Sequence, residues 1–446
     1  MPFFVLSFLA SAQSGKNFRE VHNWIDTSID IDKNRYSDVW GIVNKGKEYA
    51  VIGSIFGINF INVSDSSEFG LVDRVAGAYN GKNVIHRDIK SYKNYIYAVC
   101  DQGKNISTLQ IIDYSFLPDS VHVVYDSDSL ISRSHNVFID TLSALLYSCG
   151  RSSMQVISLA DPTNPVHVHH YFDSYVHDLY VRADTAYLNC IDDLRIVDFA
   201  DPKNPEQLFI LRDYPNKGAN HSGWLNEKGN TYVFADETRA AKVKICDVSD
   251  LSKFEIKSMI EPDGSDSSLP HNILIKKNIA YMSYYDEGLQ VYDISEQDNP
   301  IRIGYFDPKD KGDSIKPKGF WGVYPYLPSG KILVSDMKYG LYVLDTMDGF
   351  AVGIPKLQKS KFSVGVYPVP FKDELTIEIE ALKKEEVTIE ILDIQGRTCF
   401  TIQGKKVKPG KNAIELNLGN NLTSQVYMLR IELGDEVISK RVLKNR

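Results

Sequence analysis

One short phrase occurs seven times in the chain, and this repeat constrains the fold more than any other feature of the sequence. The phrase is Leu-x-hydrophobic-hydrophobic-Asp or a close variant. Its copies are Ile58-Asn-Phe-Ile-Asn62, Leu109-Gln-Ile-Ile-Asp113, Met154-Gln-Val-Ile-Ser158, Leu194-Arg-Ile-Val-Asp198, Val243-Lys-Ile-Cys-Asp247, Leu289-Gln-Val-Tyr-Asp293 and Leu341-Tyr-Val-Leu-Asp345. Successive copies start 51, 45, 40, 49, 46 and 52 residues apart. Self-similarity at such a period is typical of repeat architectures, in which each unit is one supersecondary element.

A second phrase precedes each copy and begins with polar residues followed by apolar ones. Its members are Ser37-Asp-Val, Arg87-Asp-Ile, His135-Asn-Val, His177-Asp-Leu, His221-Ser-Gly-Trp, His271-Asn-Ile and Trp321-Gly-Val. A Tyr-rich strand such as Tyr95-Ile-Tyr-Ala-Val99 lies between the two phrases in most units, and a fourth strand such as Val166 to Tyr171 follows a Pro-containing turn. Four short strands per unit, repeated seven times, predict an all-β fold: a seven-bladed β-propeller over residues 18–345.

The two ends of the repeat region support a closed ring. The seventh unit has no fourth strand after Asp345, so we expect Glu20 to Asp26 to supply it. Such a pairing joins the first and last units and removes exposed sheet edges. An open solenoid, which needs polar caps at both ends, is the less favoured alternative, as is a sandwich.

The repeat stops after a predicted linker at residues 346–362, and residues 363–446 have a different pattern. Apolar and polar residues alternate in Leu375-Thr-Ile-Glu-Ile379, Val387-Thr-Ile-Glu-Ile-Leu392, Ala413-Ile-Glu-Leu-Asn-Leu418 and Val426-Tyr-Met-Leu-Arg-Ile431. Gly-containing turns separate these segments. The pattern predicts a small antiparallel, Ig-like β-sandwich after the propeller.

The first 12 residues predict a signal peptide. An apolar run from Phe3 to Ala12 ends in Ala10-Ser11-Ala12, a small-x-small pattern that a signal peptidase accepts, and the run is too short to span a bilayer. No basic residue precedes the run, so we expect that the signal is truncated at its start. No later segment has the roughly 18 uninterrupted apolar residues of a membrane helix, and we expect no transmembrane segment.

The charge distribution argues against a nucleic-acid partner. The formal net charge is −8, and residues 361–446 contain 14 basic and 12 acidic side chains, so residues 1–360 carry −10. An acidic body repels a polyanion.

The repeat region resembles the LVIVD repeat and, as a whole, the choice-of-anchor B family. The residues that carry this resemblance include Ser37-Asp-Val-Trp-Gly41, Ser134-His-Asn-Val137, Asn220-His-Ser-Gly-Trp-Leu225, Asp236-Glu237, Tyr284-Tyr-Asp-Glu-Gly288 and Gly322-Val-Tyr-Pro-Tyr326. The resemblance implies a propeller-like domain in proteins that attach to the cell surface in different ways.

The tail is similar to the C-terminal sorting domain of type IX secretion in Bacteroidetes. The matching residues are Tyr367-Pro-Val-Pro-Phe371, Asp373-Glu-Leu-Thr-Ile377, Leu392-Asp-Ile-Gln-Gly396, Pro409-Gly410, Tyr427-Met-Leu-Arg-Ile431 and Lys440-Arg-Val-Leu-Lys444. The resemblance implies that the type IX machinery is a partner and that the chain crosses the outer membrane. The tail is then removed, with release of the protein or attachment to surface lipopolysaccharide.

Candidate ligand-binding residues cluster at the start of the innermost strand of successive repeats. They are His86, Asp88, His135, His177, Asp178, His221, His271 and Trp321. In a propeller that strand lines the central channel, and its start opens on the same face as the loops between second and third strands, where Asp236 and Glu237 lie. Because neutral imidazole and carboxylate together bind divalent metals, Asp236, Glu237, His177 and His221 are the candidate metal ligands.

Three interpretations of this face remain open. The imidazoles can be structural, each hydrogen-bonded to a third-strand carboxylate such as Asp113, Asp198 or Asp247. They can bind a ligand, with or without a divalent metal, or they can form a metal-dependent hydrolase. No catalytic constellation is complete, and no residue is assigned as catalytic. His167, His169 and His170 alternate on an outer strand, where a solvated edge is favoured over a metal site.

We therefore expect a secreted or outer-membrane-attached protein that acts as a non-catalytic binding module for a surface glycan or protein. A metal-dependent hydrolase and a purely structural adhesion module are the alternatives. The pattern does not identify the ligand.

Overall fold

A computed structural model describes residues 14–29, 34–103, 106–150, 153–262, 267–308, 319–347, 362–381, 383–392, 398–419, 422, 426–434 and 436–445. The chain divides into two compact units, Met1–Gly353 and Ile354–Arg446. The predicted signal peptide lies outside the described residues, and so does most of the predicted linker, at residues 348–361. The described part contains no helix that is long and apolar enough to cross a membrane.

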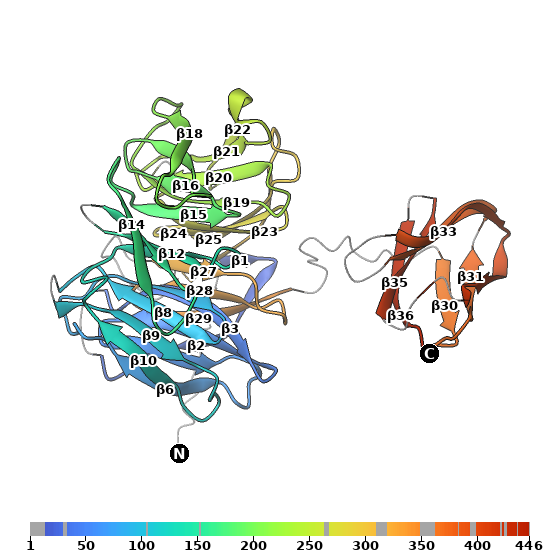
Figure 1. The fold of residues 1–446 in the computed structure, drawn as a ribbon, viewed down its shortest axis with the longest axis horizontal. Coiled ribbons are helices and arrows are strands. Elements are labelled where there is room, and N and C mark those ends of the chain that lie inside the picture. The colour runs from blue at the N-terminus through green and yellow to red at the C-terminus, as the bar shows by residue number, and fades with distance from the viewer. Residues whose placement is uncertain are drawn as a thin grey trace, which may run out of the picture. The chain divides into compact units, whose positions relative to one another are not determined.

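The larger unit consists of seven antiparallel sheets that follow one another in chain order (Figure 1). We call them blades 1 to 7. In blades 1 to 5 the strands run in sequence order from the innermost strand outwards, and in blades 6 and 7 a strand from the N-terminal segment is added at the outer edge. This arrangement confirms the predicted seven-bladed propeller.

The strands of the first four blades have the following bounds. Blade 1 contains β3 (Tyr36–Asn44), β4 (Lys47–Ser54), β5 (Gly57–Asn62) and β6 (Gly70–Ala76); blade 2 contains β7 (Arg87–Tyr92), β8 (Tyr95–Cys100), β9 (Leu109–Asp113) and β10 (His122–Ser127). Blade 3 contains β11 (Asn136–Asp140), β12 (Leu145–Cys149), β13 (Met154–Ser158) and β14 (Val166–Tyr171); blade 4 contains β15 (Asp178–Arg182), β16 (Thr185–Asn189), β17 (Leu194–Asp198) and β18 (Glu206–Leu211).

The remaining blades follow the same plan. Blade 5 contains β19 (Asn220–Leu225), β20 (Thr231–Asp236), β21 (Val243–Asp247) and β22 (Glu255–Ile260), with the 3-10 helix η2 (Leu251–Lys253) before β22. Blade 6 contains β23 (Pro270–Lys276), β24 (Ile279–Tyr284), β25 (Gly288–Asp293) and β26 (Ile301–Asp307); blade 7 contains β27 (Phe320–Tyr324), β28 (Ile332–Asp336) and β29 (Gly340–Thr346).

The N-terminal segment closes the ring. Strand β2 (Phe18–Trp24) pairs antiparallel with β29, from Phe18 opposite Thr346 to Trp24 opposite Leu341, and so completes blade 7. The predicted donor segment is therefore correct, although the strand begins two residues before Glu20. The short strand β1 (Ser14–Lys16) adds a fifth strand to blade 6 by pairing with β26, a contact that the repeat did not predict.

The burial of the strands explains their composition. In blade 3 all five residues of β12 are buried, whereas the outermost strand of blade 2, β10, has no buried residue. Inner strands are covered on both faces by the neighbouring blades, so continuous apolar runs rather than alternation mark them. Aromatic residues of the innermost strands also meet at the channel: Phe138, Tyr180 and Trp224 of blades 3, 4 and 5 pack against one another, and Phe138 and Trp224 line the channel cavity.

The smaller unit has two sheets, as expected for a sandwich. One sheet has the order β30 (Phe362–Tyr367), β31 (Glu374–Ala381), β34 (Gly410–Asn417); the other has the order β33 (Thr398–Val407), β32 (Glu385–Leu392), β35 (Val426–Leu433), β36 (Glu436–Leu443). Buried and more exposed residues alternate along β31 and β32, and the buried ones, such as Ile377 and Ile389, form one apolar core. This unit has its own core.

Candidate functional site at the mouth of the propeller channel

Five imidazoles and one indole form a closed ring of contacting aromatic side chains. We call His86, His135, His177, His221, His271 and Trp321 the mouth ring. Adjacent ring centroids are 4.2 Å apart for His86–His135, 4.1 Å for His135–His177, 4.5 Å for His177–His221, 4.5 Å for His221–His271, 4.4 Å for His271–Trp321 and 5.1 Å for Trp321–His86. The members come from six successive blades, 2 to 7, and each lies at or just before the start of an innermost strand. The structure therefore brings together every predicted ring residue.

The strand register corrects one detail of this prediction. Asp88, Asn136 and Asp178 occupy equivalent positions opposite the second strand of their blades. The residues one position earlier are Arg87, His135 and His177. Arg87, not His86, is therefore the equivalent of the two imidazoles. Arg87 is buried between blades, where its guanidinium donates to the backbone carbonyls of Ser54 and Tyr79. His86, one residue earlier, reaches the ring instead.

Backbone carbonyls of the next blade orient two of the imidazoles. His221 Nδ1 lies 3.2 Å from the carbonyl oxygen of His271, and His271 Nδ1 lies 2.8 Å from that of Trp321. A carbonyl only accepts, so both Nδ1 atoms carry the proton and Nε2 keeps the lone pair. His135 Nδ1 lies 3.2 Å from Asp101 Oδ2, which sets the same tautomer by a carboxylate.

The proposed pairing of these imidazoles with third-strand carboxylates is wrong. Asp113, Asp198 and Asp247 lie at the opposite end of their strands, where Oδ1 of each accepts the backbone N–H two residues later, from Ser115, Ala200 and Ser249. They form Asx turns that end the strand. The recurrence of Asp at this position is explained by local turn chemistry.

The buried imidazoles of the ring are neutral. Burial lowers the pKa of His221 and of His271 to about 3. Burial also lowers the pKa of His86 and of His177, and the neighbouring imidazoles lower it further. Neutral imidazole is the form that binds metals and accepts hydrogen bonds.

Glu237 extends the ring on the blade 5 side. Its Oε2 lies 3.7 Å from Nε2 of His221, and its Oε1 accepts a hydrogen bond of 2.9 Å from the hydroxyl of Tyr285. The Tyr285 ring lies 4.8 Å from that of His271. One donor atom from each of His221, Glu237 and His271 lies within 4.8 Å of the others, and so does one from each of His135, His177 and His221. Two sets of potential metal ligands thus share His221.

Asp236, the neighbour of Glu237, is engaged elsewhere. Its Oδ2 forms a fully buried ion pair with Lys244 Nζ at 2.7 Å and accepts the backbone N–H of Gly218 at 2.7 Å. Its Oδ1 accepts from the hydroxyl of Tyr214 at 2.9 Å. With both oxygens occupied, Asp236 holds blade 5 together, and we leave it out of the candidate ligand set.

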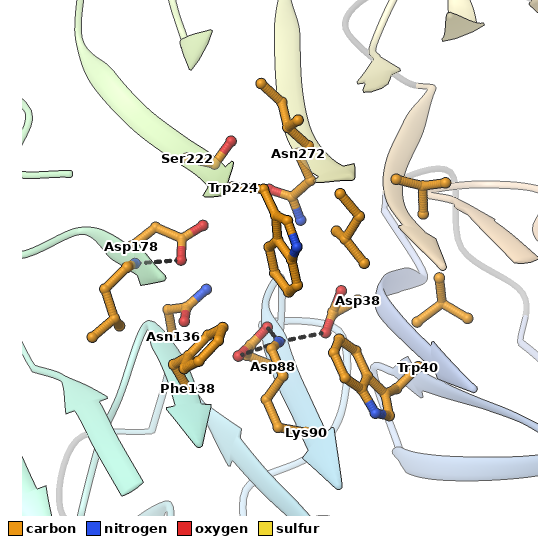
Figure 2. A pocket seen from close by; sticks show the side chains of 15 residues that line it. Asp38, Trp40, Asp88, Lys90, Asn136, Phe138, Asp178, Ser222, Trp224 and Asn272 are labelled. Carbon is orange, nitrogen blue, oxygen red and sulfur yellow. Dashed lines mark hydrogen bonds and ion pairs between the residues drawn. The ribbon is translucent and has the colours of Figure 1, made fainter. Parts of the chain in front are cut away.

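A second set of polar side chains lines the channel beneath the mouth ring. Six innermost strands each contribute one short polar residue: Asp38, Asp88, Asn136, Asp178, Ser222 and Asn272 (Figure 2). In blade 7 the position is Gly322, where a Cβ atom would lie 2.8 Å from Asp38 Oδ1. Glycine therefore leaves room for the carboxylate from blade 1.

Lys90 partly neutralises these carboxylates. Its ammonium lies 3.1 Å from Asp88 Oδ2 and 3.5 Å from Asp38 Oδ2 (Figure 2). Burial lowers the pKa of Lys90, but Asp88 and Asp38 outweigh this effect and raise it overall. Burial raises the pKa of Asp38 well above its usual range and that of Asp178 to about 7, with a further contribution from the charge of Asp88.

These channel carboxylates also join neighbouring blades. Asp38 accepts the backbone N–H of Ile89 at 3.2 Å, and Asp88 accepts that of Val137 at 2.8 Å, in each case from the next blade. Asp178, in contrast, accepts the N–H of its own neighbour Leu179 at 2.6 Å. The predicted ligand-binding residue Asp88 thus has a clear structural role, and Asp178 is the more available of the two.

The channel cavity is small. Its volume open to water is about 30 Å³, which is space for a water molecule or a small ion. A sugar or a peptide does not fit in a space of this size.

Sequence reasoning missed Lys90, Tyr285 and Lys244. Lys90 is two residues from Asp88 on the same strand, so strand alternation places both side chains on the channel face. That spacing was a usable signal for Lys90. Tyr285 and Lys244 meet their carboxylate partners only through the packing of strands, and no local signal identifies them.

Comparison with known proteins supports export and the fold. Residues 365–445 match the family of secretion system C-terminal sorting domains, which confirms the predicted type IX sorting tail. The protein is therefore secreted or held at the outer-membrane surface. No curated protein matches the chain.

Among solved structures, the β-propeller domain of Cps50 (Swd1) from Myceliophteria thermophila superposes with a TM-score of 0.52. The two share 11% sequence identity, over 74% of this chain and 99% of that domain. At this identity the likeness shows the propeller fold alone.

Proposed function

We propose that the protein is a non-catalytic binding module that acts outside the cell, with the mouth ring as its ligand site. The observation that carries this proposal is the closed ring of five imidazoles and Trp321, with ring centroids 4.1–5.1 Å apart. The ring places several neutral imidazole nitrogens around the mouth of the channel, a set of acceptors suited to a polar ligand such as a surface glycan or protein.

Unpartnered polar atoms support a ligand at this face. Among the described residues, no hydrogen-bond partner is found for the buried His86 Nδ1 or the buried Trp321 Nε1. Burying a polar group without a partner costs about 1–3 kcal/mol, so native structures rarely tolerate it without a function. The predicted membership of the choice-of-anchor B family is consistent with this proposal, since members of that family act at the cell surface.

A metal-dependent hydrolase is the second candidate. The trio His221, His271 and Glu237 favours it, because two imidazoles and one carboxylate are a donor set used by catalytic zinc sites. Such a site would keep one coordination position for water and activate it as a nucleophile.

Binding to the surface of the producing bacterium tests the leading proposal. Fluorescently labelled full-length chain is added to intact cells and to purified lipopolysaccharide, and the bound fraction is measured. The test variant is His177→Ala with His221→Ala, and the control is Lys203→Ala, an exposed residue in the turn at the opposite end of blade 4. Far-ultraviolet circular dichroism and thermal unfolding verify that all three proteins are folded.

We expect the wild type and the control to bind equally and the double variant to lose binding. Equal binding by a folded double variant would contradict the proposal. Turnover of ester, phosphoester or glycoside substrates that disappears in the double variant would favour the hydrolase instead.

A further inference from the structure

We infer that His221, His271 and Glu237 bind one divalent transition-metal ion of the zinc class at the mouth of the channel. This inference deepens the proposed function and rests on it, since it adds a metal ion to the site that the mouth ring forms. The site combines blades 5 and 6: His221 belongs to β19, His271 to β23, and Glu237 follows β20 directly.

The donor atoms are close to the positions that a metal needs. Their mutual separations do not exceed 4.8 Å, and His221 Nε2 already lies 3.7 Å from Glu237 Oε2. Ligand atoms of a tetrahedral zinc site, with bonds of about 2.0–2.1 Å, lie about 3.3 Å apart. The Glu237 side chain is 34% exposed, so it can move the remaining distance without repacking a core.

The groups around the donors are those that orient metal ligands. Each imidazole donates its Nδ1–H to a backbone carbonyl of the next blade, which leaves Nε2 with the lone pair and fixes the ring. The hydroxyl of Tyr285 donates to the Oε1 atom of Glu237 and leaves Oε2 for the metal. Hydrogen bonds of this kind from metal-binding imidazoles and carboxylates are a general feature of metal sites.

The surroundings of the trio also suit a metal. Tyr285, Trp321 and Met337 form a buried apolar cluster against which Leu269 packs. Such a cluster limits access of water to one side of the site.

Other groups of the chain are weaker candidates. The second trio, His135, His177 and His221, has no carboxylate to offset the charge of the ion. The channel carboxylates Asp38 and Asp88 share the ammonium of Lys90, which partly neutralises them. On the outer strand β14, the rings of His167 and His170 lie 4.2 Å apart, and they serve as the competing site in the test.

The test measures zinc binding by the untagged full-length chain after dialysis against a chelator. Calorimetric titration with Zn²⁺ gives affinity and stoichiometry, and the optical spectrum of the Co²⁺ form reports the coordination number. The test variants are Glu237→Gln and Tyr285→Phe, which keep the shape of the side chain. The matched controls are Glu206→Gln, on the exposed outer strand β18, and His167→Gln with His170→Gln. Thermal unfolding of each chelated protein establishes that it is folded.

We expect one Zn²⁺ per chain and a four-coordinate Co²⁺ spectrum. Tyr285→Phe should weaken binding by about 10–100-fold, the usual effect of losing a group that orients a metal ligand, and Glu237→Gln should weaken it at least as much. Both controls should bind as the wild type does. A merely structural role for Tyr285 would change the unfolding temperature without changing zinc affinity.

Three results would overturn the inference: no zinc binding by the folded wild type, unchanged affinity in Glu237→Gln, or loss of binding in the His167 and His170 control. The proposed function fails separately. If zinc does not bind but the His177 and His221 double variant still loses cell-surface binding, the mouth ring is a ligand site without a metal.

Discussion

Replacing the carboxylate by a carboxamide should have different effects at the adjacent residues Asp236 and Glu237: a loss of stability at the first and a loss of metal binding at the second. Asp236 is wholly buried against the wholly buried Lys244, and it also accepts hydrogen bonds from Tyr214 and Gly218. Glu237 is partly exposed and faces His221. We therefore predict that Asp236→Asn destabilises the propeller. Glu237→Gln should leave the stability of the metal-free propeller nearly unchanged and abolish zinc binding.

The magnitude follows from the ion pair. Asp236→Asn leaves the Lys244 ammonium buried without a countercharge, and breaking a buried pair in this way costs about 3–5 kcal/mol. For a unit of about 350 residues, with an unfolding entropy of about 2.1 cal/mol/K per residue, this corresponds to a decrease in Tm of about 4–7 °C. When both proteins are metal-free, Glu237→Gln should stay within about 0.5 kcal/mol of the wild type, as most exposed substitutions do.

Urea and thermal unfolding, followed by near-ultraviolet circular dichroism, measure both variants, and elemental analysis measures their zinc content. The companion variant Lys244→Met with Asp236→Asn removes the unpaired charge and should recover part of the lost stability. Two results would show that the roles assigned to Asp236 and Glu237 are wrong. The first is a decrease of less than about 1 kcal/mol in the free energy of unfolding of Asp236→Asn. The second is an equal loss of zinc from folded Asp236→Asn and folded Glu237→Gln.

Three further predictions concern the closure of the propeller and its channel. Deletion of residues 14–24 removes β2 from blade 7 and leaves β29 as an exposed sheet edge. The protein should therefore aggregate, which light scattering measures. A monomeric deletion variant would mean that closure of the ring is dispensable. Burial raises the pKa of Asp26, but hydrogen bonds from Ser28 and the charge of Arg74 outweigh it and keep the pKa below its usual range. The stability that Asp26 contributes should therefore be present at neutral pH and be lost as the pH falls below about 4. In urea unfolding at a series of pH values, Asp26→Asn should lose less stability over that range than the wild type. Identical pH profiles would refute this. Gly322→Ala places a Cβ atom 2.8 Å from Asp38 Oδ1 and should lower the free energy of unfolding by about 1–3 kcal/mol; a neutral effect would mean that the channel side chains are loosely packed.

The fold was predictable because the repeat is local. Six of the seven copies end in an Asp, Asn or Ser whose side-chain oxygen accepts the backbone N–H two residues later, as Asp198 does from Ala200. The periodicity therefore survives without knowledge of distant contacts. The closing strand was predictable from the missing fourth strand after Asp345. Strand β1 was not, since three residues carry no recognisable alternation.

The candidate site was predictable only in part. Recurrence identified the imidazoles, because one lies near the start of the innermost strand in each of five successive blades, 2 to 6. The second phrase aligns Arg87 with His135 and His177, as the strand register does, but it does not show that His86, one residue earlier, reaches the ring. It also treated Asp236 and Glu237 alike, because the difference between them depends on Lys244 and Tyr285, which lie on other strands.

The most direct test of the central claim is an anomalous difference map from crystals of the full-length chain grown with Co²⁺, recorded at the cobalt absorption edge. The account predicts one strong peak at the mouth of the channel, bonded to His221, His271 and Glu237. Either of two results would contradict the account. One is the absence of a peak at a mouth ring that is ordered and accessible in the crystal. The other is a peak only at His167 and His170.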